Sequence, residues 1–359
     1  MTLKGFAKFA AAALLTATLA VPAYADLKVS GDIDIDHSIT NKDTGASTNN
    51  KTNEYGTKSA GTIRLKDRKE SGDNFVEAQI EIEFNTDANR TDMEEVYMTL
   101  GNKDMNLQVG NFEKLDTYIP GQDEFVAEAN GSGADTDIEG MIGDGYVFGR
   151  AKGMGTDLAF HYTGVENVTA ELGMQFGTAT DASGDMNVLA YRPAVSAKVA
   201  DVVTINASYA TYKAEAQNGD LKQEQTKSSM GLNVVYSQDN IEAGVNYVTG
   251  KENSKDGAGN KTYKDDLTKT TMSAFATIKE VGPGSVGVNY STWTNEAKKT
   301  TKKEKVDGTM WFASYIMPIM GVEGTTMSLG YSQATSKSDA TGAKEGKAST
   351  MGIALDYRF

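Results

Sequence analysis

The chain ends on MGIALDYRF, residues 351–359, where apolar side chains alternate with small or charged ones. Successive side chains of an extended strand point to opposite faces, so one face here is apolar up to the last residue. That face carries Met351, Ile353, Leu355, Tyr357 and Phe359. An ordinary half-buried strand would show the same alternation, so the rest of the chain must indicate what this face meets.

The same alternation recurs along the chain. In VEAQIEIEF, residues 76–84, Val, Ala, Ile, Ile and Phe share one face, while three Glu and one Gln share the other. GLNVVYS (231–237) and SVGVNYS (285–291) repeat the pattern. Strands of about 9–11 residues with this pattern cross a membrane when they are tilted. A content of 37 Gly, 16 Tyr and only 5 Pro also favours strands and turns.

The number of such segments predicts a topology. Short connections such as Ala200-Asp201 and Asp239-Asn240 alternate with long hydrophilic ones such as 41–56 and 113–153. We expect strands at 27–40, 57–67, 74–85, 94–101, 105–112, 154–163, 167–178, 187–199, 202–214, 227–238, 241–250, 269–279, 285–295, 307–317, 325–335 and 347–359. Pro193 lacks a ladder donor and suggests a bulge in the eighth of them.

An even number of strands with short turns on one rim and long loops on the other is typical of an outer-membrane barrel. A soluble sandwich or solenoid can also alternate. Neither, however, predicts this regular change of connection length, or an apolar face that needs no facing sheet. The sequence therefore predicts an all-β, 16-stranded antiparallel transmembrane β-barrel with long extracellular loops and short periplasmic turns.

Residues 1–25 have the features of a cleaved secretory signal peptide. Lys4 and Lys8 precede an apolar run, and Ala23-Tyr24-Ala25 forms a small-residue cleavage site. Residues 26–359 would then form the barrel domain, with a net charge of about −16 in place of −14 once the two lysines are removed. The chain contains no cysteine, so a disulfide framework is excluded.

Two features carry a resemblance to a known family. MGIALDYRF resembles the C-terminal assembly signal of Gram-negative outer-membrane proteins. The hairpin YMTLGNKDMNLQVGNF (97–112) and the later strand RAKGMGTDLAFHYTG (150–164) are similar to the segments that flank the third loop of general bacterial porins. The resemblance implies a homotrimer of water-filled barrels in the cell outer membrane, each narrowed by an inward-folded third loop. It also implies contact with lipid and lipopolysaccharide, and recognition of Phe359 by the barrel-assembly machinery.

The candidate third loop, residues 112–140, is strongly acidic. It contains Asp116, Asp123, Glu124 and Glu128 among eight acids, against the single Lys114. On the barrel exterior this loop would be a solvated run of charge. Folded inward, it would place negative charge at the narrowest part of the pore.

The wall facing such a loop would carry charge of both signs. In the family, a basic cluster faces the acidic loop, and here the third strand also presents acids. The candidate constriction and selectivity residues are Arg64, Lys66, Glu77, Glu81, Glu83, Asp116, Asp123, Glu124, Glu128, Arg150 and Arg192. In GDIDIDHS, residues 31–38, Asp32, Asp34 and Asp36 add a third group of inward carboxylates.

These residues predict a passive channel for small hydrophilic solutes and ions. Under this register, ten lumen and loop carboxylates face four cations, so the pore would prefer cations. Two alternatives remain open. A sugar- or organic-acid-selective porin would need an aromatic slide, and Trp293 and Trp311 are its only tryptophan candidates. A structural or surface-adhesive barrel would have a plugged lumen.

Other function classes find little support in the sequence. The only histidines, His37 and His161, lie in no metal-binding or nucleophile motif, so neither catalysis nor a cofactor is expected. His161 is expected on the pore wall or rim. His37 occupies the position where an EF-hand calcium loop requires glycine, which disfavours calcium at the D-x-D-x-D run. The negative net charge disfavours nucleic acid.

Overall fold

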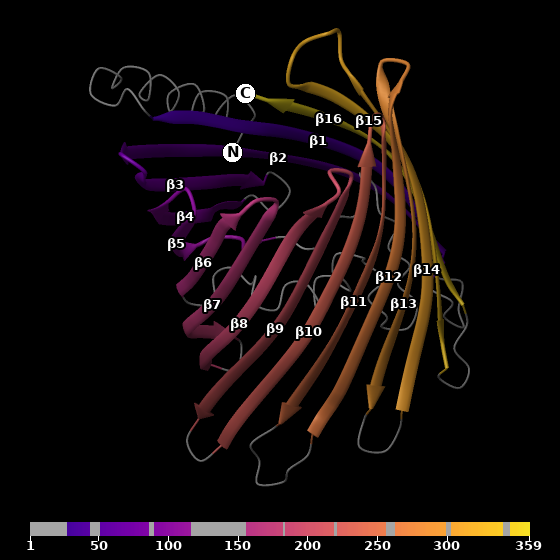
Figure 1. The fold of residues 1–359 in the computed structure, drawn as a ribbon. Helices are drawn as coiled ribbons and strands as arrows, with labels where there is room; N and C mark the ends of the chain where they lie inside the picture. Colours follow the sequence, from indigo (N-terminus) through magenta and orange to yellow (C-terminus); the bar gives the residue numbers. More distant parts are fainter. Residues whose placement is uncertain are drawn as a thin grey trace.

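The computed structural model describes residues 27–43, 51–85, 90–115, 156–181, 184–218, 221–255, 263–298, 303–339 and 345–359. Within these ranges, sixteen antiparallel strands pair in chain order, and β1 closes on β16 (Figure 1). The strands are β1 (Lys28–Asp43), β2 (Lys51–Ser71), β3 (Asn74–Asn85), β4 (Arg90–Asn102), β5 (Met105–Asn111), β6 (Thr156–Val165), β7 (Val168–Asp181), β8 (Gly184–Val199), β9 (Val203–Asn218), β10 (Leu221–Gln238), β11 (Ile241–Lys255), β12 (Tyr263–Val281), β13 (Gly284–Lys298), β14 (Lys303–Pro318), β15 (Thr325–Ser338) and β16 (Gly346–Arg358).

The predicted barrel with sixteen strands is confirmed, but most strands are longer than expected at the long-loop rim. Residues 51–56, predicted as part of a long connection, belong to β2. Every residue from 51 to 58 is exposed, so neither face is buried and the alternation that marks a strand in the sequence is missing there. The predicted signal peptide lies outside the described residues. In the described ranges no helix is long and apolar enough to cross a membrane.

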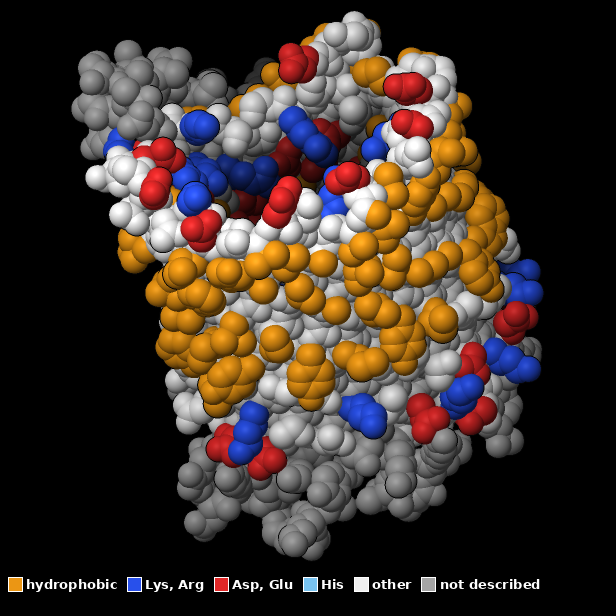
Figure 2. All heavy atoms as spheres, in the orientation of Figure 1, with side chains coloured by type: hydrophobic (Ala, Val, Ile, Leu, Met, Phe, Trp, Pro, Cys, Tyr) orange, Lys and Arg blue, Asp and Glu red, His pale blue; other side chains and the backbone are white. Residues whose placement is uncertain are grey.

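The outer surface of the barrel carries a belt of apolar side chains (Figure 2). Alternate residues of each strand are exposed there, such as Ile33 and Ile35 in β1, Ile80 in β3 and Leu232 in β10. A contiguous apolar belt around a barrel indicates a surface that meets lipid or another subunit rather than water. The alternating faces therefore have the predicted arrangement, with apolar residues outward and polar residues inward.

The C-terminal residue closes the barrel. The backbone N–H of Gly31 donates to the carbonyl of Phe359 at 3.0 Å, and the N–H of Phe359 donates to the carbonyl of Gly31 at 3.0 Å. The Phe359 ring lies over Gly31, where an added Cβ would come within 2.8 Å of it. Met351, Ile353, Leu355, Tyr357 and Phe359 are all exposed on the outer face. The terminal aromatic thus joins the last strand to the first and removes the open sheet edge.

The observed pairing of β8 differs from the sequence expectation of a bulge at Pro193. Pairing of β8 with β9 stops at Tyr191 and resumes at Ala194 without a change of register, so the bulge suggested by Pro193 is wrong. The proline interrupts the ladder because it has no N–H, while its pairing with Leu172 of β7 continues. A register shift occurs instead between β3 and β4, after the pair Glu81 and Glu95.

Candidate pore lining

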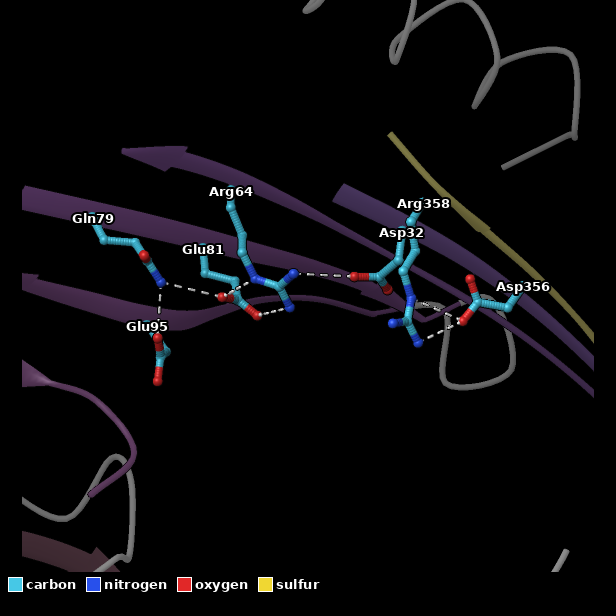
Figure 3. A network of polar contacts seen from close by, with 7 residues as sticks. All are labelled: Asp32, Arg64, Gln79, Glu81, Glu95, Asp356 and Arg358. Atoms are coloured by element: carbon cyan, nitrogen blue, oxygen red, sulfur yellow. Dashed lines mark hydrogen bonds and ion pairs between the residues drawn. The ribbon is translucent and has the colours of Figure 1, made fainter. Parts of the chain in front are cut away.

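The inner faces of β1, β2 and β3 carry an ionic network centred on Arg64 (Figure 3). Arg64 donates from Nε to Glu81 Oε2 at 2.6 Å and from Nη2 to Glu81 Oε1 at 3.1 Å. Its Nη1 lies 3.4 Å from Asp32 Oδ1. A bidentate guanidinium–carboxylate pair is geometrically specific, so Arg64 is held in one orientation across the strands.

The network continues to β4 through an amide. Glu81 and Glu95 are direct partners on neighbouring strands, an arrangement in which like charges repel. The Gln79 amide donates to Glu95 at 3.0 Å and approaches Glu81 at 3.4 Å, and the Tyr97 hydroxyl donates to Gln79 at 3.0 Å. These donors, together with Arg64, offset the repulsion and keep both carboxylates on the inner wall.

A second ionic group lies nearer the short-turn rim. Lys66 Nζ lies 2.7 Å from Glu77 Oε1, and Arg68 Nη1 lies 3.6 Å from Glu77 Oε2. The Arg68 guanidinium also stacks 3.9 Å from the centroid of the Phe75 ring. The sequence prediction missed Arg68 because the second strand was ended at residue 67. Continuing the alternation from Arg64 and Lys66 by one step would have found it.

The segment that follows β5 is tied to the inner wall. The N–H of Glu113 donates to Glu95 at 2.9 Å, and the N–H of Leu115 donates to Glu171 at 2.8 Å. Lys114 forms an ion pair with Asp157 of β6, and both side chains are fully buried. The first residues of the predicted third loop therefore lie against β4, β6 and β7 inside the barrel.

Two glycines make room for this segment. Gly110 has φ of 142°, and a Cβ there would approach the Tyr97 backbone at 2.7 Å. Gly173 of β7 leaves space for Lys114, whose Cδ would be 2.5 Å from an added Cβ. A side chain at either position would obstruct the turn into the lumen.

Glu171 makes three contacts at the point where the segment after β5 is held against the wall. Besides the Leu115 N–H, it contacts His161 Nε2 at 2.9 Å and Arg192 Nη1 at 3.4 Å. His161 faces inward and also contacts Asn106 at 2.8 Å. Arg192, predicted as a charged wall residue, is on the inner face but only 1% exposed. Its guanidinium is directed to Glu171 on the neighbouring strand β7, and the alternation in the sequence does not indicate this contact.

Of the other predicted site residues, the structure describes Glu83 and leaves five outside the described ranges. Glu83 is on the inner face of β3, opposite Thr62. The acidic loop residues and the remaining predicted cation lie outside the described residues: Asp116, Asp123, Glu124, Glu128 and Arg150. Among the residues that the structure describes, no group of three or more His, Asp or Glu side chains could hold a metal ion.

The wall formed by β9 to β12 is uncharged at mid-height. Asn206 donates to Asn233 at 2.7 Å, Asn233 donates to Asn246 at 2.6 Å, and Asn246 donates to Ser273 at 2.9 Å. All four side chains face inward and are buried. The charged groups described above lie on β1 to β4 and, around Glu171, on β6 to β8, so the lining is electrostatically asymmetric.

A hollow bearing Lys, Arg, Asp and Glu side chains opens at the rim with the short turns (Figure 2). An apolar belt around a charged hollow is the architecture of an outer-membrane channel. The chain belongs to the Gram-negative porin family, whose sequence model matches residues 10–359. No curated protein matches the chain.

Solved structures with this fold are outer-membrane proteins. In-vitro folded OmpT of Vibrio cholerae, in its trimer form, has 13% identity and a TM-score of 0.62, covering 93% of this chain and all of that one. The outer-membrane channel DcaP of Acinetobacter baumannii has 12% identity and a TM-score of 0.60, covering 93% and 97%. The anion-selective porin of Comamonas acidovorans has 14% identity and a TM-score of 0.55, covering 93% and 99%.

At these identities the structural likeness supports the fold alone. The family match adds the class of protein, a porin, and its location in the outer membrane of Gram-negative bacteria. The protein is an outer-membrane β-barrel, and its family and fold point to a channel rather than an enzyme.

Proposed function

We propose that the protein is a homotrimeric diffusion porin that passes small hydrophilic solutes and ions without energy input and prefers cations. The observation that supports the cation preference is an excess of carboxylates on the inner faces of β1 to β4 and β16, between the two rims. The carboxylates are Asp32, Asp34, Asp36, Glu77, Glu81, Glu83, Asp92, Glu95 and Asp356. The basic residues are Lys28, Lys58, Arg64, Lys66, Arg68 and Arg358, so nine carboxylates face six cations.

Fixed negative charge on a low-dielectric wall raises the local concentration of cations. The ion pairs of Arg64 and Lys66 neutralise part of this charge but leave the balance negative. The fold does not determine the sign of the selectivity, since one of the similar solved structures is described as anion-selective. The balance of lumen charge must therefore determine it.

The zero-current potential of single pores in a KCl gradient tests this proposal. We expect the cation-selective sign, with a preference that weakens as the Debye length falls from about 10 Å at 0.1 M salt to about 3 Å at 1 M. An anion-selective sign in the unmodified protein would disprove the cation preference. It would leave the porin function intact.

Two groups of substitutions locate the source of the selectivity. Neutralising four of the eight acids of the third loop together, as D116N, D123N, E124Q and E128Q, should move the zero-current potential toward zero. Neutralising the lysines between 298 and 305 is the matched control and should move it little, because Lys298 and Lys303 stand at the long-loop ends of β13 and β14. An unchanged potential in the loop variant would exclude a role of the loop carboxylates in selectivity.

The same recording distinguishes the alternative functions. Steady large conductance indicates an open diffusion pore, solute-blockable conductance a selective one, and silence a plugged barrel. The structure offers little for a tryptophan slide: Trp293 is only 3% exposed, and Trp311 faces outward and packs against Tyr331 at 5.3 Å between ring centroids. A sugar-selective pore would need another stacking surface.

The homotrimer is supported by the family and by the trimer form of one similar structure. Chemical cross-linking of the protein in mild detergent should therefore give dimers and trimers of the chain. Recovery of monomer alone would contradict this part of the proposal.

A further inference from the structure

The turn that joins β14 to β15 is unlike the other short turns. Its sequence from residue 319 to 324 is IMGVEG, with Met320 94% exposed and Val322 52% exposed. Other turns on the same rim carry polar residues, such as Lys103-Asp104 and Asp239-Asn240. Solvent-exposed turns are usually polar, so an exposed apolar turn indicates a contact with something other than water.

The turn is well ordered by hydrogen bonds. The N–H of Val322 donates to Ile319 at 3.0 Å, and the N–H of Thr325 donates to Val322 at 3.2 Å. The N–H of Arg358 donates to the Gly324 carbonyl at 2.8 Å, which ties the turn to the end of β16. The apolar side chains are therefore held in place at the rim.

Met320 occupies a backbone conformation that seldom accepts its side chain. Its φ is 54°, in the left-handed region that glycine and asparagine occupy most readily. Other short turns place Ala200, Asp239 and Glu280 in the same left-handed region, so the conformation belongs to the tight turn. The exposed apolar side chain of Met320 is what distinguishes this turn.

An apolar groove of about 270 Å³ lies between this turn and the outer surface of the barrel. The barrel side is formed by Ile33, Ile35 and Leu355, and the turn side by Ile319, Met320 and Val322. Asp356 is the one charged residue in the lining, but its side chain belongs to the inner face, where Arg358 pairs with it at 3.0 Å. The lining thus offers an occupant almost nothing but apolar contact.

We propose that this turn inserts into the periplasmic leaflet and that the groove holds an acyl chain of a membrane phospholipid. The groove is continuous with the lipid-facing belt, because Ile33, Ile35 and Leu355 are themselves exposed members of it. Short turns of such barrels lie on the periplasmic side, which assigns the leaflet. The inference does not depend on conduction or ion selectivity.

Site-specific labelling of the full-length protein in vesicles tests the proposal. The chain has no cysteine, so M320C provides a single site for a bimane fluorophore. The vesicles contain phosphatidylcholine with a nitroxide on its acyl chain, and iodide is the aqueous quencher. Met272, which is outward and 56% exposed within β12, gives the lipid control as M272C. Asn240, in a polar turn on the same rim, gives the water control as N240C.

We expect the lipid nitroxide to quench bimane at position 320 at least as strongly as at position 272, with little quenching by iodide. Position 240 should show the opposite response. Iodide quenching at 320 without lipid quenching would overturn the proposal, because the turn would lie in water. Resistance to both quenchers would also overturn it, because a second copy or another part of the chain would cover the turn. V322C gives an independent label in the same groove if M320C disturbs the turn.

Discussion

Replacing Lys114 with methionine should destabilise the folded barrel by about 3–5 kcal/mol, because it leaves the carboxylate of Asp157 buried without a counter-charge. Both side chains of this pair are fully buried. Oδ2 of Asp157 has no hydrogen-bond partner, and the other groups that interact with this carboxylate, the Phe112 backbone and the Gln175 side chain, carry no charge. Urea unfolding in detergent, followed by the heat-modifiable mobility of the barrel, measures the loss.

Two control variants make this prediction specific. K305M removes an ion pair with Asp307 of similar length, 2.8 Å, that lies at the surface. It should change stability by no more than about 1 kcal/mol, because exposed pairs contribute little. The double variant K114M/D157L removes both buried charges and should recover much of the loss. A single variant K114M that unfolds at the same urea concentration as the unmodified protein would contradict the assigned role of the pair.

Loss of Lys114 should also change the pore. The Lys114 side chain holds the beginning of the third loop against β6, and Glu113 and Leu115 donate to the wall from their backbone N–H groups. Single-channel records of K114M should therefore show larger current fluctuations than those of K305M. Equal noise in the two variants would indicate that the backbone contacts alone hold this segment.

Deleting Phe359 should sharply reduce the amount of barrel inserted into the outer membrane. The deletion removes both backbone hydrogen bonds between β16 and Gly31, each worth about 0.5–1.5 kcal/mol, and uncovers the glycine at the barrel seam. It also removes the last apolar residue of the predicted assembly signal. Heat-modifiable barrel in isolated outer membranes is the quantity to measure.

Substitutions at the same position separate the backbone from the ring. F359Y retains both and should assemble nearly normally, whereas F359A retains the backbone pair and loses the ring over Gly31. Folding into detergent without cellular machinery should be less affected by the deletion than insertion in cells, if the residue is also a recognition signal. Unchanged insertion of the deletion variant in cells would refute both roles.

The sequence by itself determined the strand number, the two faces and the identity of the closing strand. Side chains alternate with a period of two, so residues such as Ile33 and Asp34 are assigned to opposite faces before any pairing is known. The inward positions of Arg64 and Glu81 followed from this rule. The rule failed where both faces of a strand are exposed to solvent, as at residues 51–58. The two faces have the same environment there, so apolar and polar residues do not alternate in the sequence.

Only the tertiary structure decided which charges meet. Leu115 and Glu171 are 56 positions apart, and Lys114 and Asp157 are 43 apart. Their contacts depend on the stagger between strands and on the course of the chain after β5, neither of which alternation encodes. The same holds for Arg192, whose inward direction was predictable but whose burial against Glu171 was not. The local pattern specifies the direction of a side chain. Its partner is set by the register between neighbouring strands and by the course of the chain after β5.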